Sequence, residues 1–156
     1  MKRTTTFALA GVIAISAGLA FAGGHGGNPA VKARQSHMQL YAHNLGILGA
    51  MAKGEVEYDA DAASAAASNL ATLATLNQRS YWTPGTSTDE LGDETRALPA
   101  IWQEGSMAGD IGGKLAEAAQ QLAAVAGNGQ DAIGPALGPV GQQCQACHED
   151  YRKPNN

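Results

Sequence analysis

Two cysteines and a histidine near the C-terminus, Cys144, Cys147 and His148, constrain this chain more than any other feature of its sequence. Residues three and four apart share one face of an α-helix, so a helix here would place both thiols and the imidazole on the same side. Two thiols at this spacing, followed directly by a histidine, are the attachment motif of c-type haem. Cys144 and Cys147 would form the thioether bonds, and His148 would be the proximal ligand of the iron.

Three other uses of a cysteine pair compete with haem attachment: a redox dithiol, half of a zinc site and a structural disulfide. A redox dithiol is typical of a βαβ pattern, and no segment of this sequence reads as a strand. A structural zinc ion needs four nitrogen or sulfur ligands, and the sequence has only 2 cysteines. Haem attachment is therefore the preferred interpretation. The alternative is an enzyme, a thiol–disulfide oxidoreductase that uses Cys144 and Cys147.

A metal site formed by His25, His37 and His43 is a further alternative. His37 and His43 are six positions apart in the sequence. That spacing does not put two side chains on one helical face, which argues against a shared metal ion.

The first 22 residues have the pattern of a secretory signal peptide. Lys2 and Arg3 form a basic start, an apolar run covers residues 7–21, and a small-x-small cleavage site ends at Ala22. The apolar run is shorter than the roughly 20 residues that a membrane-spanning helix needs. We therefore expect a mature domain of residues 23–156, in the periplasm and without a membrane anchor.

Cleavage would remove Lys2 and Arg3 and so change the formal net charge from −4 to about −6. Nucleic-acid affinity depends on lysine and arginine at the phosphates, so this charge argues against a nucleic-acid partner. An acidic surface would steer basic partners, although solubility is the simpler explanation of the charge. Nothing in the sequence resembles a nucleophile beside a base or a pair of catalytic carboxylates. We therefore do not expect an enzyme.

Four helices are predicted from the hydrophobic spacing and from residues that begin and end helices. They cover residues 29–52, about 60–78, 99–126 and a C-terminal stretch that carries the haem motif. Pro135 and Pro139 fall inside the last helix, where an interior proline removes a hydrogen bond, so we expect a late start or a kink there. Residues 80–98 show no helical period and are expected to form a long loop. Four helices without strands predict an all-α fold, an antiparallel four-helix bundle.

The first helix carries a charged residue in an apolar stripe. The stripe is expected to comprise Val31, Met38, Tyr41, Leu45, Leu48 and Ala52. Arg34 falls on the same stripe, where a charge needs a partner or an exit to water, and a haem propionate would supply the partner. Trp82, in the loop, is expected to pack over another part of the structure.

Several stretches of the chain together resemble the class II c-type cytochromes, the family of cytochrome c′. They are Ala33–Met38, Met51–Glu55, Tyr58–Asp59, Pro84–Thr86, Ala100–Trp102 and Gly138–Arg152. The haem motif also lies at the C-terminal end, as in this family, whereas most small c-type cytochromes carry it near the N-terminus. The resemblance covers the whole mature chain. It implies a four-helix bundle with one covalently bound haem c near the C-terminal helix, and a homodimer formed through the first two helices.

The resemblance also implies roles for residues outside the haem motif. Arg34 and Gln35 match positions that contact the haem or its propionates. Arg152 matches a basic residue beside the proximal histidine, and Glu90 matches a loop position near the haem. The implied activity is one-electron transfer, binding of NO or CO, or both, and the redox partner is not identified.

Met38 separates two forms of this family. It matches the residue that faces the sixth coordination position of the iron. A methionine there ligates the iron in the low-spin relatives, whereas in five-coordinate cytochrome c′ the residue at this position is a steric gate to a site that binds NO or CO. The arginine at position 34 resembles the sequences of the five-coordinate group. The stretch from Asn44 to Glu55 resembles the sequences of the low-spin group. We favour ligation by Met38 and keep the gate as the alternative.

Overall fold

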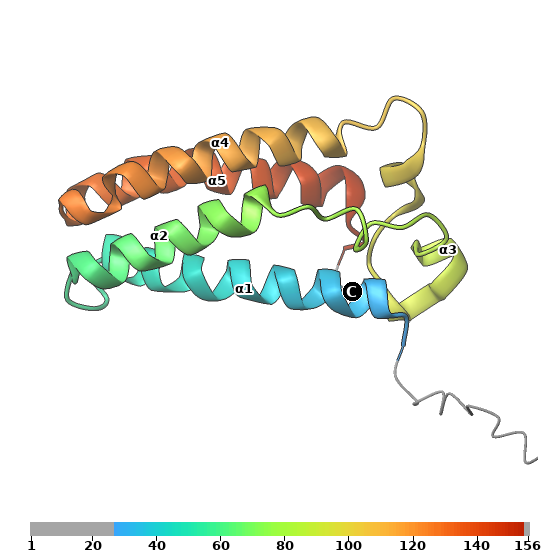
Figure 1. Ribbon diagram of the computed structural model, residues 1–156, viewed down its shortest axis with the longest axis horizontal. Helices are drawn as coiled ribbons and strands as arrows, with labels where there is room; N and C mark the ends of the chain where they lie inside the picture. Colours follow the sequence, from blue (N-terminus) through green and yellow to red (C-terminus); the bar gives the residue numbers. More distant parts are fainter. Residues whose placement is uncertain (1–26, 155–156) are drawn as a thin grey trace, which may run out of the picture.

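The computed structural model describes residues 27–154, so the predicted signal peptide at residues 1–22 and His25 lie outside the described residues. Four long helices form an antiparallel bundle (Figure 1): α1 (Pro29–Ala52), α2 (Ala60–Thr75), α4 (Ala108–Val125) and α5 (Gln130–Tyr151). The short helices are α3 (Thr88–Leu91) and the 3-10 helices η1 (Gly92–Glu94), η2 (Pro99–Trp102) and η3 (Ala126–Asn128). The predicted all-α bundle is confirmed. Within residues 27–154, no helix is both long and apolar enough to cross a membrane.

Side-chain caps set the starts of the first two helices. The Asn28 side chain accepts hydrogen bonds from the N–H groups of Ala30 and Val31, and proline occupies the first helical position. Asp59 caps α2 by accepting a hydrogen bond from the N–H of Ala62 at 2.8 Å. The predicted bounds of the first helix are confirmed, whereas α2 ends at Thr75, ahead of the predicted end near residue 78.

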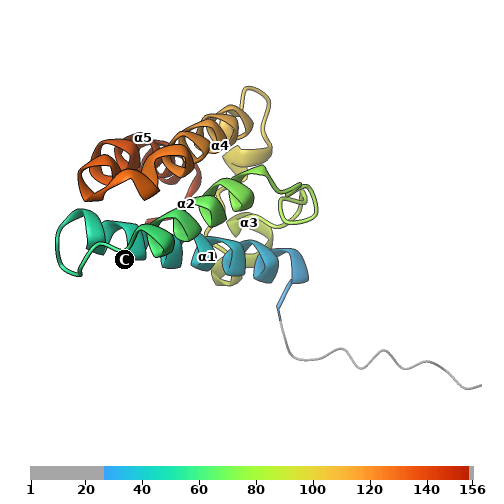
Figure 2. The ribbon, with the colours of Figure 1, turned by 60° about the vertical axis from the view of Figure 1, so that its left-hand side comes forward.

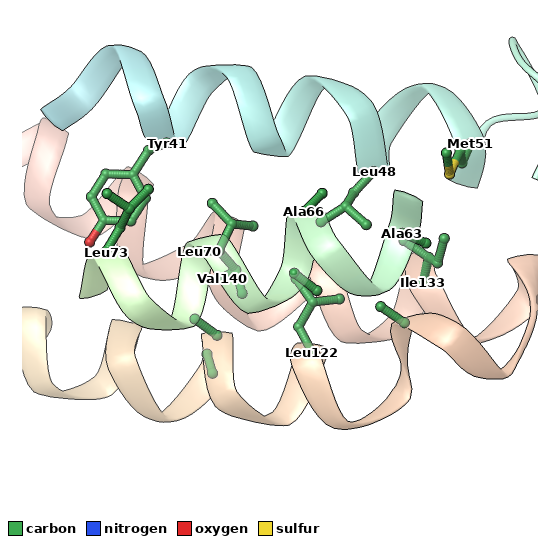
Figure 3. Close-up of a cluster of buried hydrophobic side chains, with 14 residues drawn as sticks. Tyr41, Leu48, Met51, Ala63, Ala66, Leu70, Leu73, Leu122, Ile133 and Val140 are labelled. Carbon is green, nitrogen blue, oxygen red and sulfur yellow. The ribbon is translucent and has the colours of Figure 1, made fainter. Parts of the chain in front are cut away.

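One apolar core fills the space between the four long helices (Figure 3). Its largest fully buried side chains are Leu48, Leu70, Leu122, Ile133 and Val140. Each contributes about 1.5–3 kcal/mol relative to an exposed side chain. The facing residues of α2 are mostly alanines, and such small side chains allow α2 to pack closely against both α1 and α4.

The predicted third helix, Pro99–Ala126, is wrong in its first part. Residues 99–102 form the separate helix η2, and α4 begins only at Ala108. Gly105 has φ of +82°, a left-handed conformation that an α-helix cannot contain and that glycine adopts at little cost. The chain therefore turns between η2 and α4 and does not continue as one helix.

The predicted loop over residues 80–98 contains the short helix α3, which the periodicity did not indicate. Ser87 and Glu90 form a capping box at its start, with the Ser87 side chain accepting from the N–H of Asp89 and the Glu90 carboxylate accepting from the N–H of Ser87. Figures 1 and 2 show the whole connection from α2 to α4 at one end of the bundle, beside the start of α1.

Helix α5 begins at Gln130, ahead of both prolines, and runs through Pro135 and Pro139 to Tyr151. The late start offered as one alternative is therefore wrong, and the kink stays a prediction. Each proline lacks the N–H that would bond to the preceding turn, which weakens the first half of the helix. The haem motif lies beyond both prolines, in a part of α5 that keeps a regular helical backbone.

Candidate haem-binding site

The three residues of the haem motif lie in the last two turns of α5 and are all partly buried. Cys144 and Cys147 are free thiols, not a disulfide. Burial raises the pKa of both thiols, and for Cys147 the nearby Cys144 raises it further. A reactive redox cysteine needs a lowered pKa. These thiols therefore fit covalent attachment of a ligand better than the thiol–disulfide oxidoreductase alternative, which gains no support.

His148 is held towards its neutral form. Burial lowers its pKa from the usual 6.5, and the cationic side chains of Arg152 and Arg96 lower it further. A neutral imidazole has a free nitrogen lone pair, which is the form that binds iron. The local field around His148 is therefore suited to a metal ligand.

A hollow of about 710 Å³ opens beside this part of α5. It is lined by Gln145, His148, Glu149, Arg152 and Pro154. Its volume lies in the range of small-molecule and cofactor sites. Of the motif, His148 lines this hollow and neither cysteine does, so the fit to a covalently bound haem rests on the donor set of two free thiols and a neutral imidazole on one helix.

Arg34 is 5% exposed, as expected for the apolar stripe, and its hydrogen-bond partners here are groups of the protein, whereas contact with a haem propionate stays a prediction. Its Nη1 donates to the Tyr81 carbonyl and the Thr86 hydroxyl, and its Nη2 donates to the Thr86 carbonyl and to Oγ1 of Thr95, at 2.7–3.1 Å. Trp82 covers the guanidinium at 5.0 Å, which confirms that this tryptophan packs over another element. The protein itself thus supplies neutral acceptors to Arg34.

The two other predicted haem contacts outside α5 engage the connection between α2 and α4. Gln35 is exposed, and its Nε2 donates to the Glu94 carbonyl at 3.0 Å. The exposed carboxylate of Glu90 closes the capping box with Ser87, which lowers the pKa of Glu90. Contact of either residue with a haem stays a prediction.

Met38 does not point into the bundle, so this part of the prediction is wrong. Its side chain is 37% exposed, and the buried residue at this turn of α1 is its neighbour His37, at 4%. Val31, Tyr41 and Leu48 keep their predicted buried places. The buried face of α1 runs through Arg34, His37, Tyr41 and Asn44, so at this turn the prediction chose the neighbour of the buried residue, a difference of one residue or about 100° around the helix.

Arg96 was not singled out from the sequence, although it lies close enough to His148 to lower its pKa. Its guanidinium donates through Nε and Nη2 to the Lys153 carbonyl, just after α5 ends. No local pattern predicts this contact, because it joins residues 57 positions apart. The Ser87-x-x-Glu90 capping box, in contrast, is visible in the sequence and could have predicted α3.

Among the residues that the structure describes, no group of three or more histidine, cysteine, aspartate or glutamate side chains is arranged to hold a metal ion. His37 instead packs edge-on against Tyr41. The site at the end of α5 thus has the donors of a haem protein: two thiols for the porphyrin and one imidazole for the iron. A four-helix bundle with this site at its C-terminal end defines a class of c-type haem proteins.

Comparison with known proteins narrows this class to one family. The family model described as Cytochrome C′ matches residues 29–152. The cytochrome c′ of Cereibacter sphaeroides is 43% identical over 122 residues, covering 78% of this chain and 81% of that protein. Cytochrome c-554 of the same organism is 40% identical over 124 residues, covering 79% and 80%. A solved cytochrome c′ from Rhodobacter spheriodes superposes with a TM-score of 0.76 at 41% identity, covering 81% of this chain and 96% of that one.

The chain belongs to the cytochrome c′ family. It is a mono-haem c-type cytochrome, and its cofactor is a covalently attached haem c, for which Cys144 and Cys147 are the two cysteines of the attachment motif.

Proposed function

We propose that the chain is a periplasmic one-electron carrier in which His148 is the proximal ligand of the haem iron and Met38 the sixth. The observation that carries the proposal is the grouping of two free, partly buried thiols and a neutral imidazole on the last two turns of α5. Haem c supplies the one-electron chemistry, because its iron changes between the ferric and ferrous states.

The protein's part is to hold and surround the cofactor. Cys144 and Cys147 form the thioether bonds, and His148 presents its neutral nitrogen to the iron. Arg152, beside His148, and Arg34, on α1, add positive charge near the site, and positive charge favours the reduced over the oxidised state. Gln35 and Glu90 are proposed as further haem contacts from α1 and from the start of α3.

A carrier fits the site better than an enzyme does. Thiol–disulfide chemistry needs a stabilised thiolate, and the pKa of both thiols is raised. We therefore propose that the chain transfers electrons between partner proteins without a substrate of its own. The predicted signal peptide supports the periplasm as its location.

Binding of a diatomic gas is the second candidate function. A cytochrome c′ variant from Alcaligenes xylosoxidans, 32% identical with a TM-score of 0.69, was solved as a nitric oxide complex. If Met38 is a gate and not a ligand, the sixth position of the iron in this chain would bind NO or CO.

A homodimer through α1 and α2 is proposed on similar grounds. One solved relative, 33% identical with a TM-score of 0.73, is a cytochrome c′ with an unusual ligand-controlled dimer dissociation. Two exposed apolar side chains occur here, Leu40 on α1 and Leu76 just after the end of α2. Sedimentation of the mature protein at micromolar concentration tests the dimer, and a clean monomer would contradict it.

Covalent attachment is the decisive test of the proposed function. The chain expressed with haem-attachment machinery should show a Soret band that survives acid–acetone extraction, because thioether bonds are covalent. Cys144→Ala or Cys147→Ala should each lose one thioether and most of the holoprotein, and His148→Ala should change the spectrum. A colourless chain with two titratable thiols, or single cysteine variants with wild-type amounts of bound haem, would overturn the proposal.

A further inference from the structure

Two residues adjacent in the sequence hold different helices at the haem end of the bundle. Thr95, 2% exposed, accepts a hydrogen bond at its Oγ1 from Nη2 of Arg34, on α1, at 2.7 Å. Arg96 donates through Nε, at 2.9 Å, and through Nη2 to the Lys153 carbonyl, beyond the end of α5. One peptide unit therefore lies between a bond to the first helix and a bond to the last.

Backbone pairing strengthens the α5 side of this connection. The N–H of Lys153 donates to the Arg96 carbonyl at 2.8 Å, and the N–H of Leu98 donates to the Tyr151 carbonyl at 2.9 Å. These bonds flank an antiparallel bridge between Ala97 and Arg152. The Lys153 ammonium also forms an ion pair with Asp93 at 3.0 Å. The chain that follows α5 is thus held by a short two-stranded contact.

The α1 side is equally well defined. Oγ1 of Thr95 also accepts from the N–H of Ala97 at 3.1 Å, so a single hydroxyl links Arg34 to the paired segment. Arg34 is fixed in turn by the Tyr81 and Thr86 acceptors and by Trp82. A buried group with several fixed partners transmits a shift to its neighbours, because packed interiors do not deform freely.

We propose that Thr95 and Arg96 form a tie between α1 and the end of α5, and that both are positioning residues for the haem site. The inference rests on the proposed function, since it needs His148 on α5 to bind the iron. Through Arg34, the tie holds α1, which also carries Met38. Through Lys153, it holds the chain directly after Arg152, at the end of the helix that carries His148. It therefore sets how α1 and the proximal ligand stand relative to each other.

The tie acts through its hydrogen bonds and not through the charge of Arg96. The following variants separate the loss of these hydrogen bonds from the loss of charge. Thr95→Val removes the hydroxyl without changing the charge, and Thr95→Ser restores it. Arg96→Lys keeps the charge but loses the planar two-nitrogen contact with the carbonyl, whereas Arg96→Gln loses both. Arg79→Gln is the matched control, because the exposed guanidinium of Arg79 makes no side-chain hydrogen bond within residues 27–154.

The experiment compares the holoproteins by amide hydrogen exchange, ferric absorption spectrum and midpoint potential. Thr95→Val and both Arg96 variants should speed exchange at the N–H of Lys153 by about tenfold. The same variants should also change the ferric spectrum and the potential. Thr95→Ser and Arg79→Gln should match the wild type in exchange and spectrum.

Two results would overturn the inference. Exchange at Lys153 that is unchanged in Thr95→Val and Arg96→Lys would show that the tie does not hold α5. Faster exchange with a wild-type spectrum and potential in both would show that the tie does not position the haem site. If Thr95→Val does not fold, Arg96→Lys alone decides both points. Failure of the proposed function is a separate result, because it appears as a wild-type chain without a Soret band.

Discussion

The imidazole of His37 lies edge-on to the ring of Tyr41, with the ring centroids 4.8 Å apart and the planes inclined by 73°. Tyr81 covers it from the connection after α2, at 5.7 Å. His37 is 4% exposed, and its Nε2 has no hydrogen-bond partner among the described residues. Burial therefore lowers the pKa of His37 from the usual 6.5, because a charged imidazole would lose its hydration here.

This burial predicts a pH dependence of stability. In the folded state His37 binds a proton only below its lowered pKa, whereas in the unfolded state it does so from 6.5 downwards. The stability that the folded protein gains from a neutral His37 is therefore fully present above pH 6.5. It is lost as the pH falls through the folded-state pKa. The free energy of unfolding of the holoprotein should decrease from about pH 7.5 to about pH 5.5. His37→Phe should flatten this slope in denaturant titrations.

The control for this prediction is His43→Gln, because His43 is exposed on the same helix. This variant should keep the wild-type slope. If His37→Phe and His43→Gln change the slope equally, the slope does not come from the burial of His37.

The parts of the fold that could be predicted from the sequence are those set by neighbouring residues. The start of α1 follows from the Asn28 cap and Pro29, and the shared face of Cys144, Cys147 and His148 follows from helix geometry alone. The failed bounds of the third helix lie where distant residues decide the conformation. The Trp102 indole, for example, donates to the Trp82 carbonyl at 3.0 Å, across 20 positions, and so binds η2 to the connection after α2.

The same distinction applies to the site. Buried and exposed positions on α1 depend on the rotation of the helix against its neighbours. Apolarity suggested Met38 for the buried face, but His37 occupies it, since two aromatic rings cover the imidazole. The sequence places Arg34 on the apolar stripe of α1, yet its partners come from residues 81–95, which no local pattern brings to α1.

Replacement of Arg34 by leucine should destabilise the protein strongly. Arg34→Leu removes four hydrogen bonds and leaves the buried Thr86 and Thr95 acceptors without this donor. The free energy of unfolding should fall by about 2–4 kcal/mol, as for other losses of a buried, hydrogen-bonded charge. Denaturant unfolding of the holoprotein measures this. Arg79→Leu, which removes an exposed arginine, should change it by less than about 0.5 kcal/mol.

The midpoint potential of the same variant tests the proposed haem contact of Arg34. A charge-assisted bond to a propionate would shift the potential more in Arg34→Leu than in Thr95→Val, which breaks the Arg34–Thr95 bond but keeps the charge. A stability loss with an unchanged potential would show that Arg34 only holds the connection between α2 and α4. An unchanged stability would contradict the hydrogen bonds described here.

Tyr58 should stabilise the opposite end of the bundle. Its hydroxyl donates to the Ala126 carbonyl at 2.9 Å and accepts from the N–H of Gly129 at 3.0 Å, which joins the α1–α2 turn to the α4–α5 turn. Tyr58→Phe should therefore cost about 1–2 kcal/mol in thermal or denaturant unfolding and leave the haem spectrum unchanged. Tyr81→Phe is the control, because no hydrogen bond of the Tyr81 hydroxyl occurs in the described range. Equal losses in both variants would contradict this role of Tyr58.

The last prediction concerns Met38 and separates an electron carrier from a gas binder. Core packing is the usual reason for a methionine in an amphipathic helix, but this side chain is 37% exposed and so is not explained by the core. Ligation would require its flexible thioether to turn from this exposed position towards the iron, and methionine–histidine ligation would raise the haem potential. The ferric protein should then be low-spin, with the weak long-wavelength band of methionine ligation, and Met38→Leu should abolish this band. Ferrous wild type should bind CO slowly or not at all, and Met38→Leu should bind it readily.

Leu40→Ala, which changes an exposed apolar side chain on the same helix, should leave the band in place. A high-spin ferrous wild type that takes up CO readily would show instead that Met38 is a steric gate. A five-coordinate iron has an open sixth position, and a diatomic ligand can bind there.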